Sequence, residues 1–110
     1  MIQVSIYKNA ENMITGFRLS GHAGFSYHGN DVVCAAVSAL VINTINSIEN
    51  FTSDRFQLDQ DEKKGFMEFH VTEPISKNAT LLLNSLGLGL QGIHNDYSEK
   101  YLKLTQVKSQ

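Results

Sequence analysis

Cysteine is almost absent from this sequence of 110 residues, and so is any excess of basic residues. The single cysteine, Cys34, cannot form an intramolecular disulfide or a cysteine-rich zinc site, which is typical of a protein from a reducing compartment. Nine Lys and Arg residues against eleven Asp and Glu residues give a formal charge of -2, so nucleic acid is not expected as a direct partner. Cys34 is therefore either a small buried residue or a reactive thiol.

Long hydrophobic runs are also missing. The longest one, from Val32 to Ile42, is interrupted by Ser38 and is too short to span a bilayer. The first six residues alternate between apolar and polar side chains, unlike a signal peptide. We therefore expect a cytoplasmic protein without a membrane partner. Its length predicts one domain that covers residues 1–110.

Two kinds of apolar periodicity predict the secondary structure. Alternation predicts strands over residues 2–6, 13–20, 55–59, 66–72 and 101–107, and helical spacing predicts helices over residues 32–49 and 74–90. Pro74, the only proline, fits the start of the second helix, whereas Gly87, Gly89 and Gly92 indicate close packing or fraying at its end. This order predicts an α+β domain with a mixed or antiparallel sheet of about five strands and two helices.

The first half of the helix over residues 32–49 is apolar almost all the way round. A helix of this kind is buried on more than one side. We therefore expect it either in the centre of the domain or at a subunit interface.

The segment 21–30 has neither a helical nor a strand period, and its glycines suit a loop that belongs to a site. Its two aromatic side chains either line an apolar substrate pocket or anchor the loop to the core. The residues expected to form a substrate-binding loop are Gly21, Gly24, Phe25, Tyr27 and Gly29.

Cys34 lies in the first turn of the predicted helix if Asp31 is its N-cap. The partial positive charge of a helix N-terminus favours a thiolate and lowers the pKa of a cysteine there. His22, twelve residues earlier, can take the thiol proton and later protonate a leaving amine. The alternative is a cysteine that packs in the core, with His22 in a structural hydrogen bond. The pattern alone leaves both interpretations open.

Two polar residues near Cys34 have a choice of roles. Asp31 acts either as the N-cap alone or as a third catalytic member that orients His22. Ser38 follows Cys34 by one helical turn, and its hydroxyl can bond either the thiol or the carbonyl of Cys34. Free amides of the first turn would form an oxyanion hole.

The remaining histidines are less informative. A metal site made of His22, His28 and Cys34 is a weak alternative, because no ligand-rich spacing supports it. His70 lies on a predicted strand and His94 follows the glycine-rich helix end, so we expect surface or structural roles for both.

Two short segments carry a family resemblance. The tetrapeptide Gly21-His22-Ala23-Gly24 and the segment GNDVVCAAVS, from Gly29 to Ser38, resemble the signature of the ribosomal-processing cysteine proteases of the Prp family. In length and element order the resemblance covers essentially the whole chain. It implies that Cys34 is the catalytic cysteine and His22 the catalytic histidine, and that the loop between them moves over the substrate.

The resemblance also implies a function. Members of the family are bacterial cytoplasmic endopeptidases that remove a short N-terminal extension from large-subunit ribosomal protein twenty-seven, after an apolar stretch containing phenylalanines. They act as homodimers and need no cofactor or metal. The expected mechanism is attack by Cys34, with His22 as base and then acid, through a thioester that water hydrolyses.

Two other functions stay open on the residues alone. One is a non-enzymatic, ribosome-associated scaffold domain in which Cys34 is a core residue. The other is a thiol-dependent hydrolase or transferase that acts on a small substrate.

Overall fold

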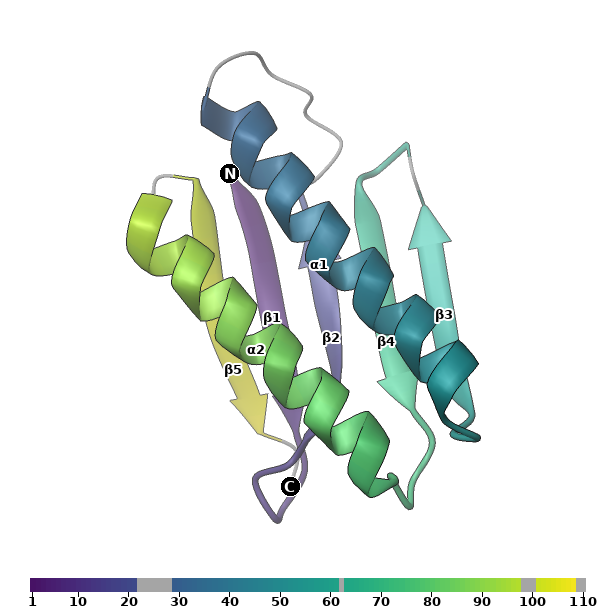
Figure 1. Cartoon of the computed structure of the whole chain (residues 1–110). Coiled ribbons are helices and arrows are strands. Elements are labelled where there is room, and N and C mark those ends of the chain that lie inside the picture. The colour runs from purple at the N-terminus through teal and green to yellow at the C-terminus, as the bar shows by residue number, and fades with distance from the viewer. Residues whose placement is uncertain (22–28, 62, 98–100, 109–110) are drawn as a thin grey trace.

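Two helices lie against one face of a five-stranded sheet (Figure 1). The computed structural model describes residues 1–21, 29–61, 63–97 and 101–108, and for residues 29–31 it describes the backbone alone. Within these residues the elements are β1 (Ile2–Lys8), β2 (Ile14–Ser20), α1 (Gly29–Phe51), β3 (Phe56–Asp61), β4 (Phe66–Val71), α2 (Lys77–Tyr97) and β5 (Leu102–Lys108). The predicted α+β fold is confirmed.

The sheet is mixed, and its strand order is β3-β4-β2-β1-β5. The pairs β1–β2, β2–β4 and β3–β4 are antiparallel, whereas β5 runs parallel to β1. A parallel neighbour needs a crossover connection, and α2 provides it. Of the two sheet types expected from the sequence, the mixed one is therefore correct.

Alternation along the strands separates a buried face from an open one. Ile2, Val4 and Ile6 of β1 are buried beneath the helices, and Phe17 stacks on Phe69 with a ring-centroid distance of 5.1 Å. The side chains at the intervening positions point to the opposite face, which neither helix covers (Figure 1). Antiparallel sheets commonly leave one face to solvent in this way.

α1 starts three residues earlier than the sequence predicted. It begins at Gly29, so Asp31 lies inside the helix instead of at its N-cap. The prediction was wrong because it took the first apolar residue as the start, whereas the polar residues 29–31 are already helical. The helix also buries only one side within this chain, since Val32 is 53% and Ile42 49% exposed.

α1 contains the most apolar segment among the described residues. Val32–Phe51 has a mean hydropathy of 1.6 and is long and apolar enough, by length and composition only, to cross a membrane. The expectation that the run is too short considered only its first eleven residues. Because Val33, Val37 and Val41 are almost fully buried toward the sheet, α1 has the packing of a core helix.

α2 also differs from its predicted bounds. It begins at Lys77, where the Ala79 N–H donates a hydrogen bond of 3.0 Å to Ser76 Oγ. Ser76 is thus the N-cap, and Pro74 lies outside the helix. At the other end the helix continues as far as Tyr97.

Two of the three glycines of α2 mark close packing, and the helix continues beyond all three. A Cβ on Gly89 would lie 2.8 Å from Leu40 Cδ1 of α1, and one on Gly87 would lie 3.2 Å from Ile14 Cδ1. A Cβ on Gly92 would have no neighbour within 4 Å. The missing side chain of Gly89 therefore lets the two helices approach each other.

Candidate active site

Cys34 is the sixth residue of α1, and its side chain is 4% exposed. The expectation that it lies in the first turn is wrong, because α1 begins at Gly29. In an α-helix the sixth amide donates to the carbonyl four residues earlier, so the amide of Cys34 is not a free donor for an oxyanion. The free amides of α1 belong to its start, around residues 29–31.

The position of Cys34 also changes the electrostatic argument. It lies about 7 Å along the axis from the first residue of α1, and the effect of helix charge falls off beyond the first turn. The N-terminus of α1 therefore favours a thiolate at Cys34 less than the sequence suggested. A nucleophile at this position depends more on a neighbouring base.

Helical geometry fixes which side of α1 carries the site. Leu40 faces α2, since it contacts the position of Gly89. At 100° per residue, Ser38 points about 160° and Cys34 about 120° away from Leu40. Both side chains therefore lie on the side of α1 that faces away from α2. Ser38 is half-buried there.

Several of the predicted site residues lie outside the described residues. These are His22, Gly24, Phe25, Tyr27 and His28. Gly29 and Asp31 lie in α1, but the side chain of Asp31 is not described. The catalytic role of His22 and the roles proposed for the loop therefore stay predictions.

Gly21 is the last described residue before this segment, and the structure explains why it is a glycine. Its φ is +79°, a left-handed conformation that favours glycine. A Cβ there would also lie 2.5 Å from the carbonyl oxygen of Met1. Gly21 thus has a structural reason that is independent of its predicted role in substrate binding.

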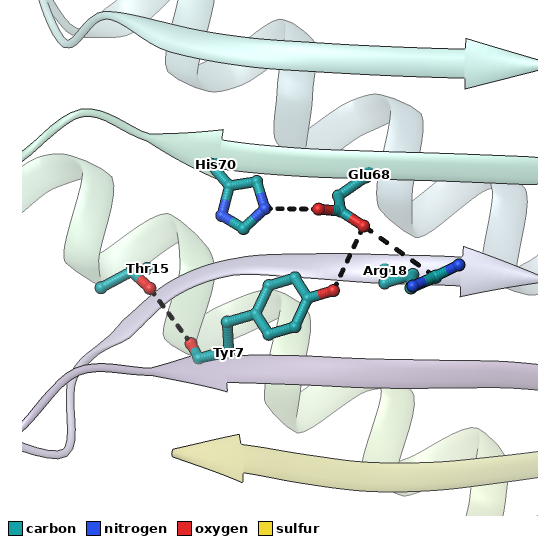
Figure 2. Close-up of polar contacts among 5 residues, drawn as sticks. All are labelled: Tyr7, Thr15, Arg18, Glu68 and His70. Atoms are coloured by element: carbon teal, nitrogen blue, oxygen red, sulfur yellow. Dashed lines mark hydrogen bonds and ion pairs between the residues drawn. The ribbon is translucent and has the colours of Figure 1, made fainter. Parts of the chain in front are cut away.

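His70 lies on the open face of the sheet, opposite the layer that contains Cys34. Its ring stacks on Tyr7 with a centroid distance of 4.9 Å, and its Nε2 lies 2.8 Å from Glu68 Oε2 (Figure 2). Tyr7 donates a hydrogen bond of 3.3 Å to the other oxygen of Glu68. The predicted structural role of His70 is therefore supported by its contacts.

The electrostatics of this cluster are those of a satisfied surface network. The hydrogen bond with His70 holds the pKa of Glu68 below its ordinary value, and the Tyr7 and Arg18 contacts add to this against an opposing effect of burial. Arg18 Nε lies 3.9 Å from Glu68 Oε1. Burial and the negative charge of Glu68 raise the pKa of Tyr7. Nothing in this network connects it to Cys34.

The position of His94 differs from the predicted one. It lies within α2 and not beyond its end as predicted. It follows Gly89 by five residues, which turns it about 140° from the side that faces α1. His22 stays the predicted base of Cys34.

No group of three His, Cys, Asp or Glu side chains that could hold a metal ion occurs within the described part of the chain. The alternative metal site of His22, His28 and Cys34 involves two residues outside that part. It therefore stays untested.

Comparison with known proteins identifies one family. The model of the family described as cysteine protease Prp matches residues 1–103. The ribosomal processing cysteine protease Prp of Staphylococcus aureus strain Mu50 is 32% identical over 99 residues, which cover 90% of this chain and 93% of the relative.

Two solved structures share the fold. One is the essential ribosomal processing protease Prp from S. aureus in complex with a substrate peptide, with a TM-score of 0.86 and 28% identity; the match covers 99% of this chain and 100% of the other. The second is the S. aureus protease in complex with a covalently linked product peptide, with a TM-score of 0.87 and 31% identity. That match covers 97% of this chain and 100% of the other.

Proposed function

The chain belongs to the Prp family of cysteine proteases, and from this premise we propose that it removes the short N-terminal extension of large-subunit ribosomal protein twenty-seven. The observation that carries the proposal is the similarity, over 97% of the chain, to a ribosomal processing protease with a covalently linked product peptide. A covalent peptide is what nucleophilic catalysis by a cysteine leaves on an enzyme. The only cysteine of this chain is Cys34.

In the proposed mechanism, Cys34 is the nucleophile and His22 the base. His22 takes the thiol proton as the sulfur attacks the scissile carbonyl, and then gives that proton to the leaving amine. The resulting thioester is hydrolysed by water, which releases the extension as a carboxylic acid and restores the thiol. The oxyanion is held by amides other than that of Cys34, because the helix uses that one.

The burial of Cys34 bears on the alternative function, a non-enzymatic scaffold domain in which Cys34 is a core residue. A side chain that is 4% exposed is what a core cysteine would show as well. What favours the nucleophile is the match to a protease family over residues 1–103 together with the chain's lack of any other cysteine. A scaffold role would leave the resemblance to peptide-bound proteases without a reason.

We also propose that the enzyme works in the cytoplasm as a homodimer. Leu81 is 67% and Leu88 77% exposed on α2, and Val32 is 53% exposed on α1. Apolar groups gathered on one side of the molecule are frequent at contacts between proteins. They support a partner on the outer side of the helices.

Cleavage of the precursor by purified wild type, Cys34→Ala and His22→Ala tests the function. The wild type should release the extension, and each variant should be slower by on the order of a thousandfold or more. His70→Ala is a matched control, because His70 lies on the open face of the sheet and Cys34 lies on α1, on the other side of the sheet. It should cleave at nearly the wild-type rate.

Circular dichroism of each variant checks that the fold is kept. Cleavage by Cys34→Ala at the wild-type rate would contradict the assignment of the nucleophile. If the wild type leaves the precursor intact, the proposed substrate is wrong, and activity on a small thioester would then indicate the alternative thiol-dependent hydrolase.

A further inference from the structure

The two members of the proposed catalytic pair belong to different layers of the molecule. Cys34 lies on α1, which is part of the helical layer. His22 is joined to Gly21, which directly follows β2 of the sheet and packs against the carbonyl of Met1. The distance between the sulfur and the base therefore depends on where α1 lies across the sheet.

The position of α1 across the sheet depends on its contact with α2. The two helices lie side by side, and the backbone of α1 is near that of α2 at more positions than it is near that of any strand (Figure 1). Toward the sheet, α1 presents buried side chains such as Val33, Val37 and Val41. Because the distance between two packed helices depends on the side chains between them, the groups between α1 and α2 determine where α1 lies.

At Gly89 of α2, the side chain of Leu40 occupies the space beside the missing side chain. A Cβ on Gly89 would lie 2.8 Å from Leu40 Cδ1, 3.5 Å from its Cδ2 and 3.7 Å from its Cγ. Leu82 and Ile93, seven residues before and four residues after Gly89, lie on the same face of α2 and pack against the core. Gly89 is thus a gap in a row of larger side chains, and this gap admits Leu40.

We propose that Gly89 is a positioning residue, because the gap that receives Leu40 fixes the spacing of α1 and α2 and so places the sulfur of Cys34 at its base. This rests on the proposed function, since it takes Cys34 as the nucleophile and His22 as the base. Leu40 follows Cys34 by six residues, which is about 9 Å along the helix axis, so a shift of α1 at Leu40 also moves the sulfur. A misplacement of about 1 Å can slow catalysis by about a hundredfold.

Three glycine-to-alanine variants of α2 separate this role from a general effect on the helix. Each variant adds one methyl group to the same helix and removes one glycine, which is unfavourable there. In Gly89→Ala the methyl group meets Leu40 of α1, whereas in Gly87→Ala it would lie 3.2 Å from Ile14 Cδ1 of β2. In Gly92→Ala it would have no neighbour within 4 Å. The first variant alone changes the gap that faces α1.

The kcat for cleavage of the precursor is the first readout. Carbon atoms in contact are about 3.5–4.0 Å apart, so a methyl group 2.8 Å from Leu40 Cδ1 requires a movement of about 1 Å. Gly89→Ala should therefore lower kcat by about tenfold or more, with a smaller change in KM. Gly87→Ala and Gly92→Ala should keep kcat within about twofold. Leu40→Val combined with Gly89→Ala removes the overlapping methyl group and should restore most of the lost kcat.

Alkylation of Cys34 by iodoacetamide, measured against pH, is a readout that a loss of stability does not move. A thiol beside its base reacts at a pH below the pKa of about 8.5 that an ordinary cysteine has. In Gly89→Ala the midpoint of the pH profile should shift toward that value, and Leu40→Val should bring it back. Circular dichroism checks that each variant is folded.

The results distinguish the role of Gly89 from the proposed function. If Gly89→Ala keeps the kcat and the labelling profile of the wild type, or if Gly87→Ala loses as much kcat, the proposal about Gly89 is wrong and the proposed function stands. A double variant that regains no activity also contradicts the proposal. If Gly89→Ala does not fold, Leu40→Ala, which empties the gap, replaces it, and a wild-type kcat there overturns the proposal. If the wild type leaves the precursor intact, the proposed function itself fails.

Discussion

At the scale of single residues, the burial of Cys34 and its position in α1 are the two facts that bear most on the proposed mechanism. The sequence predicts Cys34 as the nucleophile, since a chain with one cysteine has one candidate for that role. It misplaced that residue within the helix, because polar residues 29–31 do not show the apolar period that marked the helix start. In the proposed mechanism the base therefore contributes more to the activation of Cys34 than the helix terminus does.

Histidines show what the sequence can and cannot decide at this scale. The alternation of β4 was enough to place His70 on the face opposite Met67 and Phe69, and its contacts with Glu68 agree. His94 was placed wrongly, because the glycines of α2 suggested an end that the helix does not have.

Asp54 offers a test of one carboxylate. It lies between α1 and β3, and its Oδ2 accepts a hydrogen bond of 2.9 Å from the Ser76 N–H. Burial alone would raise its pKa, but hydrogen bonds from Ser76 and Thr52 outweigh that effect, and the pKa lies below its ordinary value of 3.8. Asp54→Ala should lower the free energy of unfolding by about 0.5–1 kcal/mol at neutral pH, a small value because water reaches the carboxylate.

The pH dependence of this deficit follows from the direction of the shift. A lowered pKa in the folded state stabilises the fold above the ordinary pKa, and this contribution is lost as the pH falls through the folded-state value. Urea unfolding of wild type and Asp54→Ala should therefore converge below the ordinary value of 3.8. A deficit that is the same at every pH would show that the charge of Asp54 is not the cause.

At the scale of elements, the strands were easier to predict than the helix ends. Ile2, Val4 and Ile6 alternate with polar residues because only one face of the sheet is buried, and all three are buried in the structure. Helix ends depend on capping instead. The cap of α2 is Ser76, a residue that follows Pro74 by two positions and carries no periodic signal.

Gly16 of β2 allows a prediction about a strand. A Cβ at Gly16 would clash with the carbonyl oxygen of Phe69 on the neighbouring strand β4, which is backbone and cannot turn aside. Gly16→Ala should therefore lower the free energy of unfolding by about 1–3 kcal/mol in urea titrations, the usual range for overpacking. Ser20→Ala, two positions from Arg18 on the same face of β2, is the control and should change stability by less than about 0.5 kcal/mol. Equal stability of the two variants would contradict the close approach of β2 and β4.

At the scale of the whole molecule, the sequence predicted the layers but not the strand order. Two helices and about five strands followed from periodicity, whereas the pairing of β5 with β1 joins residues about a hundred positions apart. No local pattern near Leu102 distinguishes a parallel neighbour from an antiparallel one. The crossover by α2 makes the parallel pair possible.

The proposed homodimer is a prediction at this scale. Sedimentation at about micromolar concentration should give twice the mass of one chain, because exposed Leu81 and Leu88 favour a covered outer side of the helices. A monomer at concentrations where the enzyme cleaves its substrate would contradict the dimer. It would leave the mechanism at Cys34 unaffected.

The proposed mechanism depends most on the sulfur of Cys34 as the atom that becomes bonded to the peptide. The most direct measurement is the mass of the wild-type enzyme, quenched in acid during a single turnover of the precursor. We expect a transient increase equal to the released extension less one water molecule, located on Cys34 by fragmentation, because a thioester forms at that sulfur. Cleavage that proceeds while Cys34 stays unmodified, and that persists in Cys34→Ala, would contradict the account.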